Sequence, residues 1–96
     1  MVGVASFGGR AGFIAKTADD QFGNVFRHDI RAAGVTYTTP PAAAGGEPTG
    51  CSLILVTPDG ERTMNTMLGV SPYLGADEVD AALIGSGRIL YLEGYM

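Results

Sequence analysis

Acidic side chains have the clearest potential for chemistry in this sequence. Asp19 and Asp20 are adjacent and could form an acid/base or metal-binding pair, but carboxylates in front of a helical pattern more commonly cap that helix. A second group, Asp77, Glu78 and Asp80, opens another helical pattern. Carboxylates are stabilised by the positive end of the helix dipole, so we interpret this group as a solvated helix start. Both groups therefore have a structural interpretation.

Glu93 differs from these groups because it ends an apolar run and precedes Gly94. The run, residues 88–93, reads as a buried strand. Open α/β sheets bind ligands beyond the carboxyl ends of their strands, and this placement makes Glu93 our candidate substrate-binding residue. From the residues alone, a structural role as the partner of an arginine or a backbone N–H is equally open.

The remaining reactive residue types do not form a site. His28 and Cys51 are the single histidine and the single cysteine, which argues against a zinc site. We expect His28 to be a solvated surface residue and Cys51 to be a buried, inert thiol at the start of an apolar strand. Gly8, Gly9 and Gly12 fit a turn better than a phosphate loop, because no phosphate-binding helix begins there. We assign no catalytic, cofactor-binding or metal-binding residue.

The best-marked element that could position these side chains is a helix between Asp19–Asp20 and Gly34. Its apolar residues recur at helical spacing and predict the buried face: Phe22, Val25, Phe26, Ile30 and Ala33. Its basic residues fall on the opposite face, which we expect to meet solvent: Arg27, His28 and Arg31. Gly34 then ends the helix.

The other patterns alternate between strands and helices. We predict a helix end over residues 1–7, strands over 12–17, 35–39 and 88–93, and a helix over 76–84 with Val79 and Leu83 inward. Residues 40–50 are rich in proline and glycine and predict a mobile loop. Strands at 51–57 and 61–68 flank the turn Pro58-Asp59-Gly60 and form a hairpin. This order predicts an α/β sheet with an antiparallel insertion.

Composition narrows the cellular setting. The net charge is −4 and the six basic residues are scattered, so no electrostatic footprint for nucleic acid is present. One cysteine suits a reducing compartment. The apolar start of the chain is too short for a signal peptide or a membrane span. We expect a cytoplasmic protein with no membrane association.

The order of these patterns resembles the ribokinase-like (PfkB) family of carbohydrate and nucleoside kinases. Residues 7–23 resemble the family's small-Gly, strand and Gly-x-Asp-x-x-Gly segment, with Asp20 and Gly23 in place and Ala18 where a glycine is usual. The later matches lie in four runs: Ala33-Gly34-Val35, Thr49-Gly50 with residues 51–62, residues 65–70, and residues 90–95. Glu61-Arg62-Thr63-Met64 leans toward the adenosine-kinase-like branch.

The resemblance implies a partial ribokinase-like fold over 1–96, with βαβ units, an antiparallel hairpin or lid insertion, and a lid region at about 35–50. It implies transfer of phosphate from ATP, with Mg²⁺, to a hydroxyl of a sugar or a nucleoside such as adenosine or a ribose-like acceptor. Glu93 would then contact that acceptor. Members of the family often dimerise through their lid strands, so a homodimer through these strands is a further implication.

The family's catalytic Gly-Ala-Gly-Asp motif, with its anion hole at a helix N-terminus, is not in these 96 residues. We therefore expect this chain to be a fragment without the C-terminal ATP-binding and catalytic part, inactive alone and without a bound cofactor. The alternative function is a non-catalytic α/β module that binds a partner strand or a small molecule. The sequence does not specify the phosphoryl acceptor.

Overall fold

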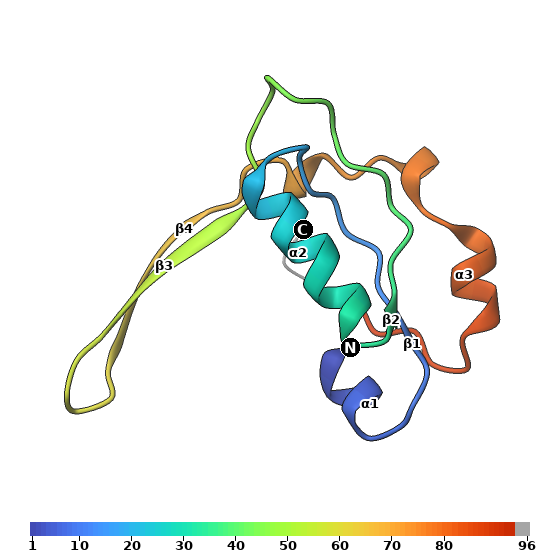
Figure 1. Cartoon of the computed structure of the whole chain (residues 1–96), viewed down its shortest axis with the longest axis horizontal. Coiled ribbons are helices and arrows are strands. Elements are labelled where there is room, and N and C mark those ends of the chain that lie inside the picture. The colour runs from blue at the N-terminus through green and yellow to red at the C-terminus, as the bar shows by residue number, and fades with distance from the viewer. Residues whose placement is uncertain (94–96) are drawn as a thin grey trace.

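The computed structural model describes residues 1–93 and arranges them as an α/β body with one projecting arm (Figure 1). The body contains α1, β1, α2, β2 and α3, and the arm is the hairpin of β3 and β4. In chain order the elements are α1 Val2–Ser6, β1 Ala11–Gly12, α2 Gln21–Ala32, β2 Val35–Thr36, β3 Cys51–Val56, β4 Arg62–Met67 and α3 Ala81–Ser86. Two short 3-10 turns, Ser71–Tyr73 and Ala76–Glu78, connect β4 to α3.

A βαβ unit forms the centre of the body. β1 and β2 are parallel, with Ala11 opposite Val35 and Gly12 opposite Thr36, and α2 makes the crossover between them. Asp20 caps α2 by accepting a hydrogen bond from the Gly23 N–H. The chain leaves the helix through Gly34 at φ +82°, a left-handed conformation that glycine adopts without steric cost. The predicted start and stop of this helix are confirmed.

The predicted strands at 12–17 and 35–39 are shorter in the structure than in the prediction. Pairing is limited to the two-residue strands β1 and β2, followed by a single bridge between Ala18 and Ala42. The alternation that predicted the second strand is nevertheless present, because Val35, Tyr37 and Thr39 are buried while the residues between them are exposed. Between Thr36 and the bridge at Ala42, no strand pairing joins the two segments within the described residues.

A small core lies between α2 and this extended layer. Ile30, Val35 and Tyr37 are buried, and the rings of Phe13, Phe26 and Tyr37 pack with centroids 5.7 to 6.2 Å apart. The Tyr37 hydroxyl donates to the Ala15 carbonyl at 2.9 Å, which satisfies the polar end of a buried aromatic residue.

The predicted buried face of α2 is only partly correct. Phe22 and Val25 are 65% and 53% exposed, whereas Arg27, which we had placed on the solvent face, is 8% exposed. Arg27 can be buried at this position because hydrogen-bond acceptors surround its guanidinium, as described below. His28 does lie on the surface, as predicted, and its ring nitrogen Nδ1 is 2.9 Å from Asp29.

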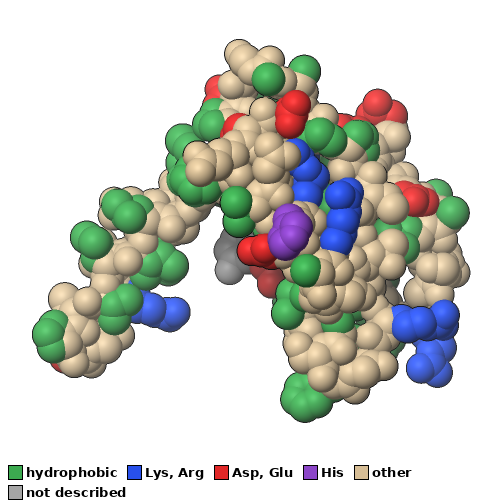
Figure 2. Space-filling model, viewed as in Figure 1, with side chains coloured by type: hydrophobic (Ala, Val, Ile, Leu, Met, Phe, Trp, Pro, Cys, Tyr) green, Lys and Arg blue, Asp and Glu red, His purple; other side chains and the backbone are tan. Residues whose placement is uncertain are grey.

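The hairpin is confirmed with an unbroken register from Cys51 opposite Met67 to Val56 opposite Arg62. It projects away from the body, and hydrophobic side chains are spread along it (Figures 1 and 2). All twelve strand residues are exposed. The prediction of a buried Cys51 thiol is therefore wrong, since nothing in the described part of the chain covers either face of the hairpin.

The C-terminal predictions need two corrections. The helix expected over 76–84 is divided into the 3-10 turn Ala76–Glu78 and the helix α3, because Val79 and Asp80 adopt extended conformations between them. The strand expected over 88–93 is wrong: the segment is irregular, and Ile89 is 90% exposed. An apolar run becomes a strand only where a neighbouring edge pairs with it, and 88–93 pairs with no strand within the described residues.

The predicted loop over 40–50 contains a single bridge, between Ala42 and Ala18, and otherwise no helix or strand. This agrees with an irregular segment, and its mobility stays a prediction. Among the helices of residues 1–93, none has the length and apolarity needed to cross a bilayer.

Candidate functional site

Glu93, the residue predicted to bind substrate, is exposed at the end of the described residues. Its Oε1 accepts a hydrogen bond from the Tyr91 hydroxyl at 2.9 Å, and this bond to a carboxylate raises the pKa of Tyr91. Gly94 and Tyr95, which complete the family-like run, lie outside the described residues. The substrate-binding role of Glu93 stays a prediction.

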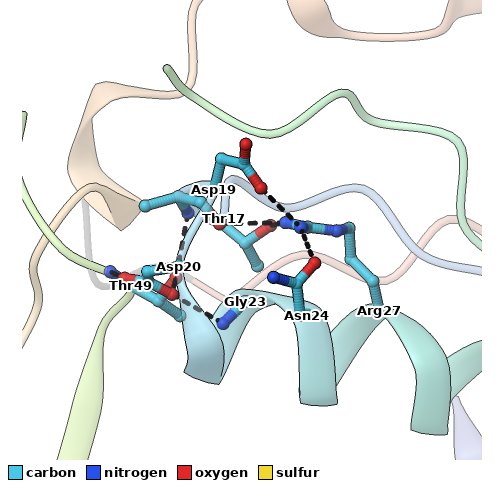
Figure 3. Close-up of polar contacts among 8 residues, drawn as sticks. Thr17, Asp19, Asp20, Gly23, Asn24, Arg27 and Thr49 are labelled. Carbon is cyan, nitrogen blue, oxygen red and sulfur yellow. Dashed lines mark hydrogen bonds and ion pairs between the residues drawn. The ribbon is translucent and has the colours of Figure 1, made fainter. Parts of the chain in front are cut away.

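The most densely bonded polar group lies instead where α2 begins, and Figure 3 shows its arrangement. We call it the Asp20 cluster; its members are Thr17, Ala18, Asp19, Asp20, Gly23, Asn24, Arg27 and Thr49. Asp20 uses both carboxylate oxygens. Oδ1 accepts from the Gly23 N–H and from the Thr49 hydroxyl, each at 2.7 Å, and Oδ2 accepts from the Thr49 N–H at 2.8 Å. The sequence predicted the bond to the helix but not the bonds to Thr49.

These bonds favour the ionised form of Asp20. The Thr49 N–H, then the Gly23 N–H and the Thr49 hydroxyl, hold the pKa of Asp20 below its usual value. A carboxylate whose pKa is lower in the folded state stabilises the fold above its unfolded pKa. This contribution is lost as the pH falls through the lowered folded pKa. Asp20 is therefore ionised at neutral pH and can accept all three bonds.

Thr49 joins the cluster to the arm. Its hydroxyl donates to Asp20 and accepts from the Ala18 N–H at 2.9 Å, and the residue is 7% exposed. Thr49 and Gly50 lead directly into β3. The cluster thus links the start of α2 to the base of the hairpin, although 29 residues separate Asp20 from Thr49.

Arg27 forms the other half of the cluster. Its Nη1 donates to the Thr17 hydroxyl and to the Ala18 carbonyl, both at 2.9 Å, and its Nη2 donates to the Asn24 Oδ1 at 2.7 Å. The Asp19 carboxylate lies farther away, at 3.5 Å, and is mostly exposed. A buried guanidinium is tolerated here because hydrogen-bond acceptors surround it. The Asn24–Arg27 spacing of three residues was a local signal for this bond.

The cluster has a structural role, because it connects the start of α2 to the base of the hairpin, and it does not have the arrangement of a reaction centre. Asp19 and Asp20 face different partners and do not form an acid/base pair. In the described part of the chain, every fully buried side-chain nitrogen and oxygen has a hydrogen-bond partner, so the buried atoms of the cluster are all used within the fold. The capping interpretation of Asp20 is confirmed.

A second polar link holds the segment after the hairpin. Lys16 Nζ lies 2.6 Å from Glu78 Oε2 and donates to the Tyr73 carbonyl at 3.0 Å. Glu78 also accepts from the Gly75 N–H at 2.8 Å. The Lys16 bond, and then the Gly75 bond, lower the pKa of Glu78. Glu78 is thus a bonded, partly buried residue and not the solvated one that we predicted.

Asp80, from the same acidic group, caps α3, which begins later than the helix that we predicted over 76–84. Its Oδ1 accepts from the Leu83 N–H at 2.9 Å, and this bond is exposed. Asp20 and Asp80 therefore perform the same capping task in different surroundings, since in the described structure only Asp20 also bonds to a distant segment.

Two solved structures are similar to this chain over most of its length. The sequence is 50% identical to the adenosine kinase from Sinorhizobium meliloti, with a TM-score of 0.82 over 88% of this chain and 26% of that one. It is 49% identical to a probable sugar kinase protein from Rhizobium etli CFN 42, with a TM-score of 0.80 over 86% of this chain and 25% of that one.

A curated relative is the 5-dehydro-2-deoxygluconokinase of Shouchella clausii (strain KSM-K16). It is 30% identical over 97% of this chain, and the match spans 29% of the relative's length. The sequence pattern of the pfkB family carbohydrate kinases matches residues 1–96. The βαβ unit, the projecting hairpin and this match over the full chain lead to one conclusion: the chain belongs to the pfkB family of carbohydrate kinases.

Proposed function

We propose that this chain is a portion of an ATP-dependent kinase that phosphorylates a hydroxyl group of a sugar or a nucleoside. The observation that carries the proposal is the family match over residues 1–96. The 50% identity to a protein named adenosine kinase supports a nucleoside acceptor, and the 49% identity to one named as a sugar kinase supports a sugar. We propose a cytoplasmic location, where an exposed single thiol such as Cys51 stays reduced.

ATP and Mg²⁺ do not fit the described residues of this chain. Within 1–93, no group of three or more histidine, cysteine or acidic residues is arranged to hold a metal ion, and the start of α2 is occupied by Asp20. A carboxylate at that position would repel a phosphate group. We therefore propose that both cofactors bind to other parts of the complete kinase, and we assign this chain the positioning of the acceptor.

The test compares the 96-residue chain with the product of the complete reading frame that encodes it. Both are incubated with ATP and Mg²⁺ and with adenosine, ribose or fructose, and ADP formation is followed by a coupled assay. We expect acceptor-dependent turnover from the complete protein and none from the chain alone. Absence of turnover with all three acceptors would favour the non-catalytic module, and turnover that scales with the purified chain would contradict its inactivity.

We propose that Glu93 binds the acceptor in the complete kinase, because a carboxylate accepts strong hydrogen bonds from sugar hydroxyls. Glu93→Gln keeps the shape and removes the charge. The expected result is a weaker acceptor affinity, by about 1–3 kcal/mol for hydrogen bonds to a charged group. Steady-state kinetics should show a raised acceptor KM and an unchanged ATP KM.

Glu47→Gln is the control for Glu93→Gln, since Glu47 is an exposed residue of the irregular loop. We expect this variant to behave as the wild type. Unchanged acceptor KM and kcat in Glu93→Gln, together with a loss of stability, would show that Glu93 has a structural role.

We also propose that the hairpin pairs with a second copy of the protein. Apolar side chains occupy both of its faces, with Leu53 and Leu55 on one and Ile54 and Val56 on the other, and all four are exposed. A two-stranded hairpin is marginally stable without a covering layer. Sedimentation equilibrium of the complete protein should give a dimer mass, and Leu55→Asp should lower it toward the monomer. A monomeric wild type would contradict this proposal.

A further inference from the structure

The hairpin is attached to the body only through its base, as far as the described residues show. Its twelve strand residues are exposed, so its direction depends on the segments that enter β3 and leave β4. Pro48, Thr49 and Gly50 enter, and Leu68, Gly69 and Val70 leave. The Val70 N–H donates to the Pro48 carbonyl at 2.8 Å, which ties the two segments together. We call these six residues the hairpin base.

We infer that Asp20 is a positioning residue that fixes the direction of the hairpin by holding Thr49 at the N-terminus of α2. The inference rests on the proposed function, because the direction of the hairpin matters if this arm forms a wall of the acceptor site. Capping α2 requires one carboxylate oxygen, and Oδ1 supplies it. The second oxygen bonds to the Thr49 N–H, which belongs to the hairpin base.

The link is well suited to resist rotation of the base. Thr49 is held at two atoms, because its N–H and its hydroxyl both donate to Asp20, and its hydroxyl also accepts from the Ala18 N–H. Two bonds to one carboxylate fix an orientation as well as a distance. The six-residue strands are about 20 Å long, so a rotation of about 10° at the base moves the tip by about 3 Å.

Asp20→Asn separates the two tasks of Asp20. Asparagine caps helices as well as aspartate does, so α2 keeps its start. The amide, however, has one acceptor oxygen where the carboxylate had two. In the orientation that keeps the oxygen on the Gly23 N–H, the NH₂ group faces the Thr49 N–H, and a donor cannot bond to a donor.

Thr49 gives the reciprocal pair of variants. Thr49→Val removes the hydroxyl with little change in shape, and Thr49→Ser restores it. The matched control is Asp80→Asn, which makes the same substitution at a helix cap that does not contact the hairpin. Thermal unfolding of each variant reports any general loss of stability.

The experiment uses the complete protein and two independent readouts. The first is hydrogen exchange of backbone amides in peptides that cover 48–51 and 68–71. We expect Asp20→Asn and Thr49→Val to exchange about tenfold faster or more in these peptides, and Thr49→Ser and Asp80→Asn to match the wild type. The second is steady-state kinetics with whichever of adenosine, ribose and fructose supports turnover by the complete protein.

In the kinetic readout, a loose base lowers the fraction of molecules with a correctly placed hairpin and therefore the apparent acceptor affinity. We expect the acceptor KM to rise about tenfold in Asp20→Asn and Thr49→Val, while the ATP KM stays within about twofold. Wild-type exchange at the base in Asp20→Asn would overturn the inference. An equal KM increase in Asp80→Asn would also overturn it.

The proposed function and the positioning role of Asp20 can be refuted separately. A wild type without kinase activity would refute the proposed function, and the exchange comparison would still decide whether Asp20 holds the hairpin base. An active wild type with unchanged exchange at the hairpin base in Asp20→Asn would leave the proposed function intact and refute the positioning role.

Discussion

Replacing Gly23 with alanine should destabilise the protein by about 2–3 kcal/mol, the upper part of the range for overpacking a tight site. A Cβ at this position would lie 2.1 Å from the Ala18 carbonyl oxygen and 2.9 Å from the Thr49 hydroxyl. The first of these atoms belongs to the backbone and cannot move aside without disturbing the Asp20 cluster. Helix propensity alone predicts the opposite, because alanine is favoured over glycine by about 1 kcal/mol within a helix.

Urea unfolding of the complete protein measures this effect. Gly85→Ala is the matched control, because Gly85 lies within α3 and a Cβ there would meet no atom within 4 Å. We expect Gly85→Ala to be neutral or slightly stabilising. If Gly23→Ala were as stable as the wild type, helix propensity would outweigh the contact with Ala18, and the close approach of α2 to residue 18 would be wrong.

Replacing Arg27 with methionine should cost about 3 kcal/mol, the range for removing one partner from a buried charged network. Methionine keeps most of the apolar stem. The Ala18 carbonyl, the Thr17 hydroxyl and the Asn24 side chain would each lose the donor that Arg27 supplies. Buried acceptors without a donor cost more than the lost bond itself contributed.

Arg62→Met is the control for Arg27→Met, since Arg62 is an exposed residue of β4. We expect a change within about 0.5 kcal/mol there, as for most surface substitutions. Equal and small effects of the two substitutions in urea unfolding would contradict the buried role of Arg27.

The features that were predictable from the sequence depend on neighbouring residues. Asp20 caps a helix three residues before Gly23, Gly34 ends it, and Pro58-Asp59-Gly60 closes a hairpin between two six-residue strands. In each case a few adjacent residues determine the backbone through their own dihedral preferences and short-range hydrogen bonds.

The features that were not predictable depend on distant residues. Thr49 reaches Asp20 across 29 positions and Lys16 reaches Glu78 across 62, so neither bond has a local pattern. Helical periodicity predicted Arg27 on the solvent face of α2, because charged residues are assumed to be exposed. The acceptors that make its burial possible lie partly in residues 17–19, outside the helix. The run 88–93 has the composition of a strand, but pairing requires an edge that its own residues do not supply.

The exposed hairpin makes newly synthesised protein prone to aggregation. β3 reads Cys-Ser-Leu-Ile-Leu-Val, six residues without charge, proline or glycine, and such segments stack readily into cross-β aggregates when they meet copies of themselves. Pro48 and Pro58 stand on either side of this segment, and Asp59, Glu61 and Arg62 follow it. Prolines and charges at these places act as gatekeepers against fibril growth. On the exposed arm these flanking residues limit self-association, and their replacement by apolar residues should lower the soluble yield on expression.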